Sequence, residues 1–154
     1  MGKLKQTHLF LLKILAMQLV KHPTEIAFFS IKVPAGFPSP AIDYMEERID
    51  LNREFIKHPL STFVVECEGY SMINAFIPPK AKLIVDRSVT PRSGDIVLAV
   101  LNGEWTVKYF IKNDYKCWLR PANSKFQDIE ITAEMNMEVW GVVTTILINP
   151  KDVK

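Results

Sequence analysis

From Thr62 onward, the hydrophobic pattern of the chain is that of a β protein. Short runs rich in β-branched and aromatic residues follow one another, and no stretch with helical periodicity separates them. Strands at this spacing predict a mainly β body. The predicted strands are Thr62–Glu68, Leu83–Asp86, Asp95–Leu101, Trp105–Ile111, Tyr115–Arg120, Asp128–Ile131 and Met137–Ile148.

Turn-forming residues occupy two of the breaks between these runs. Asn102-Gly103 is typical of a two-residue type I′ hairpin, because both central residues of that turn need a positive φ. Asn113-Asp114 is a weaker signal of a second turn. The sequence therefore predicts a hairpin at the first break and a turn at the second.

Prolines interrupt the first forty residues. Pro23 and the stretch Val33–Pro40 cannot lie inside a stable helix or a central strand, because each proline lacks an amide donor and forces its predecessor into an extended conformation. Residues 33–40 are therefore predicted to form an exposed, extended segment of small residues. A protease must receive a peptide in that form.

A short helix is predicted directly after this segment. Ser39 is a suitable N-cap and Pro40 a suitable first helical residue. Apolar residues then recur at helical spacing on one face, at Ile42, Met45 and Ile49. We expect a helix over about residues 40–50.

Composition and charge narrow the class of protein. A chain of 154 residues that is 48% hydrophobic can bury one good core and is too short for two ordinary domains. Its 19 basic and 17 acidic side chains argue against a broad nucleic-acid-binding face. Residues 1–35 hold five lysines against one glutamate, so this basic arm carries +4 and the remainder −2.

The two cysteines and the apolar N-terminal run carry no sign of a metal site or a membrane anchor. Cys67 and Cys117 lie in apolar, strand-like runs without metal-ligand spacing, and we expect buried free thiols in a reducing compartment, although the sequence leaves a disulfide between them open. Lys13 and Gln18 interrupt the apolar run Leu9–Val20, which is too short to span a bilayer. We expect a short amphipathic helix or an apolar arm there.

Ser71 and Lys108 are the candidate catalytic residues. Ser71 follows Gly69-Tyr70 where the first predicted strand ends, and Lys108 lies in a strand that is otherwise nearly all apolar. Burial of that lysine would lower its pKa and make the neutral amine a base for a serine hydroxyl. The alternative is an outward lysine that protects a sheet edge.

A histidine base has no evident place in the sequence. His8 and His22 lie in the arm, His58 is next to Pro59, and none has a strand-end position beside an aspartate. A lysine is therefore the simpler choice of base if Ser71 is a nucleophile.

Several motifs resemble the LexA/UmuD family of self-cleaving serine peptidases. The segment Gly36–Asn52, GFPSPAIDYMEERIDLN, strongly resembles the start of the processed chain in the UmuD branch. Ser71-Met72 and Lys108 are 37 residues apart, and Ala35 lies 36 residues before Ser71, as this family leads one to expect. The peptidase-core motifs occur in the family order, at Ser71-Met72, Leu83–Asp86, Gly94–Val97 and Gly103–Lys108.

The resemblance implies a fold, a reaction and partners. It implies a compact β-rich peptidase fold in which Ser71 is the nucleophile, Lys108 the general base and Ala35–Gly36 the self-cleaved bond. Backbone amides of Ser71 and Met72 are our candidates for the oxyanion hole. Residues 1–35 would then be a removable arm, and residues 36–154 the peptidase and polymerase-accessory domain.

The implied setting is the cytoplasmic response to DNA damage. A RecA filament on single-stranded DNA would activate cleavage, and the shortened product would form a homodimer and join a UmuC-type subunit as polymerase V for error-prone translesion synthesis. No cofactor, metal, membrane contact or sequence-specific DNA binding is expected.

The loop after Ser71 departs from the family pattern. Relatives usually have an acidic, glycine-rich loop here, whereas Ile73–Lys82 reads INAFIPPKAK. Reduced or differently regulated cleavage is therefore one reading, and a non-catalytic polymerase-binding module with a relic dyad is another. A signal-peptidase-like enzyme has the same Ser/Lys pair, but the absence of a proper anchor and the segment Gly36–Pro40 count against it.

Overall fold

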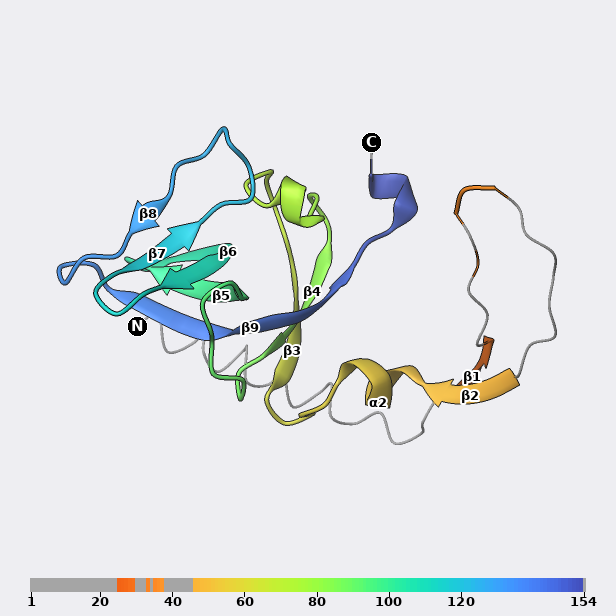
Figure 1. Cartoon of the computed structure of the whole chain (residues 1–154). Coiled ribbons are helices and arrows are strands. Elements are labelled where there is room, and N and C mark those ends of the chain that lie inside the picture. Colours follow the sequence, from red (N-terminus) through yellow and green to blue (C-terminus); the bar gives the residue numbers. More distant parts are fainter. Residues whose placement is uncertain (1–24, 30–32, 34, 38–45, 154) are drawn as a thin grey trace, which may run out of the picture. The chain divides into compact units, whose positions relative to one another are not determined.

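The computed structural model describes residues 25–29, 33, 35–37 and 46–153 (Figure 1). These residues belong to two compact units, one within residues 1–57 and one over His58–Lys154. The division between the units falls after Lys57 in the sequence. The predicted boundary after Ala35 is a cleavage boundary and stays a prediction.

The described residues of the N-terminal unit form a two-stranded sheet and one short helix. Strand β1 (Glu25–Phe29) pairs antiparallel with β2 (Glu46–Asp50), and helix α2 (Leu51–Phe55) follows at once. Strand β1 was not predicted, because we assigned its residues to the arm.

The predicted helix over about residues 40–50 is wrong for residues 46–50, and its first part lies outside the described residues. The Asp50 side chain accepts a hydrogen bond from the Asn52 amide at 2.9 Å, so Asp50 is the N-cap and the helix begins after it. The residues before Asp50 instead form ladder hydrogen bonds with β1. The Ser39 cap and the apolar run Leu9–Val20 also lie outside the described residues.

The described residues around the predicted cleavage bond are exposed. Val33 and Phe37 are 76% and 93% exposed, and Ala35 and Gly36 are exposed as well. The backbone bends at residues 35–37 and forms neither helix nor strand there. The prediction of an exposed segment is therefore confirmed for these residues, although the bend departs from a fully extended chain.

The C-terminal unit is built on a seven-stranded antiparallel sheet with the order β3-β4-β9-β5-β6-β7-β8 (Figure 1). Each predicted strand is present, and the mainly β fold is confirmed. Two short 3₁₀ helices, Ile73–Ala75 and Pro150–Asp152, accompany the sheet. The strands are β3 (Thr62–Glu66), β4 (Lys82–Asp86), β5 (Ile96–Leu101), β6 (Glu104–Lys112), β7 (Cys117–Arg120), β8 (Ile129–Glu130) and β9 (Met137–Leu147).

The long strand β9 joins the two halves of this sheet (Figure 1). Its first half pairs with β5 and its second half with β4, with a register shift in each ladder. At Gly141 the strands come so close that an added Cβ would lie 2.7 Å from Val85 Cγ1 and 2.8 Å from the Asp86 carbonyl oxygen. Only glycine fits this position without displacing β4.

Both predicted turns are present. Asn102 and Gly103 have φ values of 50° and 88° between β5 and β6, as a type I′ hairpin requires. At the second turn the Asn113 side-chain oxygen accepts from the amides of Tyr115 and Lys116, at 2.9 and 2.8 Å. These two turns fix the order β5-β6-β7 in the sheet.

Buried core side chains come from both halves of the sheet and from the loop between Cys67 and Ala81. Cys67 and Cys117 are both free thiols; Cys67 is buried, whereas Cys117 is half-buried. Buried side chains of the loop, among them Met72 and Ile77, add to those of the strands. One core cluster consists of Val97, Ala99, Phe110, Leu119 and Val142.

Candidate active site

Strand β6 directs Lys108 toward the interior. Alternate residues of a strand point to the same face, so Thr106, Lys108 and Phe110 share one face of β6. Phe110 is buried in the core cluster on that face. Lys108 is therefore half-buried at the rim of the core, and the alternative of an outward edge lysine is wrong.

The loop between β3 and β4 presents Ser71. The Cys67 amide donates to the Ala81 carbonyl and the Lys80 amide to the Cys67 carbonyl, both at 2.8 Å, and these bonds close the base of the loop. Gly69 turns the chain with a φ of 80°, and the buried Met72 side chain anchors the residue after Ser71. The Ser71 side chain stays half-buried at the protein surface.

Ser71 and Lys108 lie within hydrogen-bonding distance. Lys108 Nζ is 3.0 Å from Ser71 Oγ, 2.8 Å from Thr106 Oγ1 and 3.0 Å from the Val107 carbonyl oxygen. An ammonium group would donate one hydrogen to each of these three oxygens. A neutral amine has two hydrogens, and donation of these to Thr106 and Val107 leaves its lone pair facing the Ser71 hydroxyl.

Burial favours the neutral amine. It lowers the pKa of Lys108 from the ordinary value of 10.5, and only a charged thiolate at the nearby Cys67 would oppose this shift. Burial also raises the pKa of Cys67 above its ordinary 9.0. Cys67 is therefore uncharged at neutral pH and does not then stabilise the ammonium form of Lys108.

Two backbone amides beside Ser71 have no hydrogen-bond acceptor among the described residues. Within the part of the chain that the structure describes, the amides of Ser71 and Met72 donate no hydrogen bond. The Met72 carbonyl, in contrast, accepts from the amides of Ala75 and Ile77 at 3.0 and 3.2 Å. Both free donors are next to the nucleophile candidate, where an oxyanion would form.

Comparison with known proteins identifies the family. The model of the Peptidase S24-like family matches residues 27–144. The chain belongs to this family. It therefore has the fold and the serine-peptidase class of the LexA/UmuD proteins, as the sequence motifs predicted.

Named relatives span most of the S24-like chain. Protein MucA of Salmonella typhimurium is 37% identical over 124 residues, which cover 80% of this chain and 84% of MucA. Protein ImpA of Shigella flexneri is 36% identical over 126 residues, covering 82% and 86%. A LexA repressor of Desulfatibacillum aliphaticivorans is 34% identical over 118 residues, covering 75% of this chain and 58% of the repressor.

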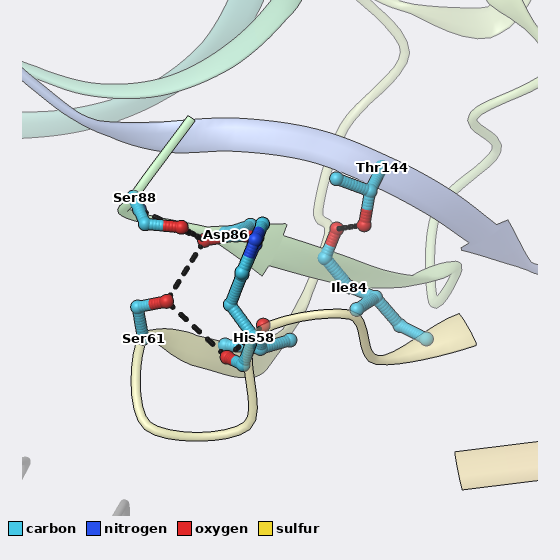
Figure 2. A network of polar contacts seen from close by, with 7 residues as sticks. His58, Ser61, Ile84, Asp86, Ser88 and Thr144 are labelled. Atoms are coloured by element: carbon cyan, nitrogen blue, oxygen red, sulfur yellow. Dashed lines mark hydrogen bonds and ion pairs between the residues drawn. The ribbon is translucent and has the colours of Figure 1, made fainter. Parts of the chain in front are cut away.

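One histidine in this S24-like chain does lie beside an aspartate, contrary to the sequence analysis. Figure 2 shows His58 next to Asp86, the last residue of β4, with His58 Nδ1 at 2.5 Å from the carboxylate. The antiparallel pairing of β3 and β4 places Thr62 opposite Asp86, so the turn before β3 meets the end of β4.

This cluster differs from a serine peptidase triad. Ser61 Oγ and Ser88 Oγ donate to the Asp86 carboxylate at 3.0 and 2.7 Å, so both serines bind the acid and not the imidazole (Figure 2). Burial by itself would raise the pKa of Asp86, but hydrogen bonds from Ser88, His58 and Ser61 outweigh it and lower the pKa from 3.8 to about 2. The cluster therefore holds a buried carboxylate in its charged form.

The loop after Ser71 keeps a left-handed backbone at two positions without glycine. Phe76 has a φ of 59° and Lys80 a φ of 71°, a region that favours glycine. The predicted departure from the glycine-rich loop of relatives thus places two side chains other than glycine at positions with positive φ.

Sequence reasoning missed two further residues at the site. Thr106 contacts the amine of Lys108, and its position two residues earlier in the same strand was a signal that strand alternation could have used. Asn123 donates from Nδ2 to the Tyr70 carbonyl at 2.9 Å, and no local pattern indicated this contact across 53 residues.

The described residues contain no group of three or more side chains that could hold a metal ion. In the same part of the chain, no helix is long and apolar enough to cross a membrane.

Proposed function

We propose that this chain is a self-cleaving serine peptidase that cuts its own Ala35–Gly36 bond. The observation that carries the proposal is the 3.0 Å contact between Ser71 Oγ and the half-buried Lys108 amine. A nucleophile and its base need this distance, and burial supplies the neutral form of the base. Exposure of Ala35 and Gly36 in a segment without helix or strand supports them as the substrate.

The first half of the reaction would form an acyl-enzyme. Ser71 Oγ attacks the Ala35 carbonyl carbon while Lys108 takes the hydroxyl proton. The amides of Ser71 and Met72 donate to the oxyanion that develops on Ala35. Collapse of this intermediate breaks the bond to Gly36, and Lys108 returns the proton to the leaving amine.

The second half would release the arm. Water attacks the acyl carbonyl as Lys108 accepts one of its protons, and the proton returns to Ser71 Oγ when the ester breaks. The products are residues 1–35 with a new carboxylate at Ala35 and a body that begins at Gly36. Because substrate and enzyme belong to one polypeptide or one assembly, a weak intrinsic affinity for the segment suffices.

The geometry favours this function over the two alternatives. A relic dyad in a binding module has no need for an intact hydrogen bond or a half-buried lysine, since burying an amine costs free energy. A signal-peptidase-like enzyme would cut another chain, whereas the exposed Ala35 and Gly36 offer a substrate within this one.

The cellular role is a proposal based on the family resemblance. We propose that a RecA filament on single-stranded DNA stimulates cleavage in the cytoplasm. The product that begins at Gly36 would then form a homodimer and serve a UmuC-type polymerase subunit in translesion synthesis. Sequence similarity to UmuD-like relatives supports this role.

Mass spectrometry of the purified full chain tests the proposal. Incubation at alkaline pH, or with RecA, nucleotide and single-stranded DNA, should produce a fragment that begins at Gly36. Ser71→Ala and Lys108→Arg should each slow cleavage by about 100-fold or more. The first removes the nucleophilic hydroxyl, and the second replaces the amine with a guanidinium group that cannot act as a base. Lys112→Arg makes the same change at an exposed position of the same strand and should cleave normally.

Two results would reject the proposal. One is a cut at another bond, or no cut under either condition. The other is cleavage at Gly36 by Lys108→Arg at the wild-type rate. Thermal melts of the variants should match that of the wild type, which excludes unfolding as the cause of lost cleavage.

A further inference from the structure

The loop between β7 and β8 supports the nucleophile loop directly. Figure 1 shows the two loops at the same end of the C-terminal unit, and two hydrogen bonds join them. The Asn74 amide donates to the Ala122 carbonyl at 2.9 Å, and Asn123 Nδ2 donates to the Tyr70 carbonyl, also at 2.9 Å. Of the two bonds, the one from Asn123 uses a side chain and reaches the residue just before Ser71.

Both ends of the Asn123 side chain are fixed. Its Oδ1 accepts from the Lys125 amide at 3.0 Å, which makes an Asx turn, while its Nδ2 faces the Tyr70 carbonyl. These partners determine which end of the amide is oxygen and which is nitrogen. Among common side chains that form Asx turns, aspartate has the acceptor and lacks the donor.

The contact acts on the peptide group that contains the Ser71 amide. The Tyr70 carbonyl and the Ser71 N–H belong to one planar unit, so a donor that holds the oxygen also fixes the direction of the N–H. A hydrogen bond to the carbonyl also polarises the N–H and strengthens what it donates. The Ile73 amide contributes a longer bond of 3.3 Å to the same carbonyl.

We propose that Asn123 is a positioning residue that orients the Ser71 amide toward the oxyanion of the cleavage reaction. This inference rests on the proposed function, because it assigns a purpose to Asn123 only if Ser71 attacks a carbonyl. Asn123 does not contact Ser71 Oγ or Lys108 Nζ through any described hydrogen bond, so it acts through the backbone.

Variants that keep the turn and remove the donor test the inference. Asn123→Asp and Asn123→Ser both retain an acceptor for the Lys125 amide. Aspartate cannot donate, and the serine hydroxyl is one bond too short to reach Tyr70. The first-order cleavage rate should be measured from pH 7 to 11, so that its plateau and its midpoint are separated.

The expected effect is on the plateau. Loss of a direct oxyanion donor lowers the rate about 100- to 1,000-fold, so misorientation of one should lower the plateau by about tenfold or more. The midpoint of Asn123→Ser should match the wild type, because that variant leaves Lys108 and its three contacts unchanged. Ser71 should also react more slowly with a fluorophosphonate in these variants, because the phosphoryl oxygen of that reagent takes the oxyanion position.

A matched pair of control variants separates this role from turn stability. Asn113 forms the same kind of turn through Oδ1 at the β6–β7 connection, and no described residue accepts from its Nδ2. Asn113→Asp and Asn113→Ser should therefore cleave at the wild-type rate.

The outcomes distinguish the inference from the proposed function. If both Asn123 variants reach the wild-type plateau while Ser71→Ala is inactive, the inference is wrong and the proposed function stands. The inference is also wrong if the plateau falls only in proportion to the unfolded fraction seen in a thermal melt. If Ser71→Ala and Lys108→Arg still cleave, the proposed function itself fails.

Discussion

Removal of the contact between Thr106 and Lys108 should have two opposite effects on cleavage, one on its pH midpoint and one on its maximal rate. Thr106→Val keeps the shape of the side chain and removes the oxygen that lies 2.8 Å from Lys108 Nζ. That oxygen stabilises the ammonium more than the amine, because hydrogen bonds to charged groups are the stronger ones. Its loss should lower the pKa of Lys108 further below 10.5, and the cleavage midpoint should move to lower pH.

The size of the shift follows from the difference between the two kinds of hydrogen bond. A charged hydrogen bond contributes about 1.5–3 kcal/mol and a neutral one about 0.5–1.5 kcal/mol, so the difference is about 1 kcal/mol or slightly more. That difference equals about one pKa unit. Because Lys108 is only half-buried and water replaces part of the lost bond, we expect a shift of about half a unit.

The lower pKa of Lys108 favours cleavage near neutral pH, but the maximal rate at high pH should fall. Above the midpoint Lys108 is already neutral, so a lower pKa gains nothing there. The amine has lost one of the two acceptors that point its lone pair at Ser71, and the maximal rate should fall by about tenfold. Near neutral pH the two effects partly offset each other.

The assay is the first-order appearance of the Gly36 fragment from pH 7 to 11. Thr144→Val is the matched control, since the Thr144 hydroxyl donates to the Ile84 carbonyl at 3.3 Å, outside the dyad (Figure 2). That variant should keep both midpoint and plateau. A midpoint that stays or rises in Thr106→Val, together with an unchanged plateau, would refute the assigned role of this hydroxyl.

Two predictions concern stability. The pKa of Asp86 falls from 3.8 to about 2 on folding, so its charged form stabilises the fold by about 2 kcal/mol above pH 4, and this is lost as pH falls toward 2. Urea unfolding should show Asp86→Asn less stable by about that amount at pH 6 and equal to wild type at pH 2; a constant difference would contradict this. Phe76→Gly and Lys80→Gly should each raise the unfolding free energy by up to about 1 kcal/mol, because relief of the left-handed strain exceeds the added chain entropy. The matched Phe76→Ala and Lys80→Ala keep the strain, so equal stability of the Gly and Ala variants would count against this reasoning.

The strands of the body could be predicted because local sequence determines them. Runs of β-branched residues ended by Asn102-Gly103 or Asn113 indicate strands and turns without any knowledge of the tertiary structure. The site was predictable to the same degree, since a lysine in an apolar strand and a serine after a glycine turn are local features. Pairing them required the family resemblance, because nothing in the 36 intervening residues indicates that they meet.

In the N-terminal unit, local hydrophobic periodicity gave a wrong prediction. Ile42, Met45 and Ile49 match helical spacing, but Asp50 is the cap of a helix that begins later. The residues before it pair with β1, which precedes β2 by 16 intervening residues. Periodicity in a short window cannot weigh a distant strand partner against a local helix.

Clusters of residues that are far apart in the sequence could not be predicted for a related reason. His58 and Asp86 are 28 residues apart, and they meet because β3 and β4 pair in one particular register. A shift of that register by one residue would turn the side chains of β3 to the opposite face and separate the cluster. Register is a property of the packed sheet, so pairs that depend on it appear only in the structure.

The atypical loop after Ser71 bears on stability more than on chemistry. The distance from Ser71 to Lys108 depends on the backbone path of this loop, which hydrogen bonds at Cys67 and the buried Met72 and Ile77 maintain. Phe76 is 79% exposed and contributes little to that packing, yet its backbone keeps the left-handed turn. The strain there is therefore borne by the rest of the loop. It follows that Phe76→Gly should stabilise the chain and leave its cleavage rate unchanged, whereas a slower Phe76→Gly would mean that the aromatic ring itself takes part in the reaction.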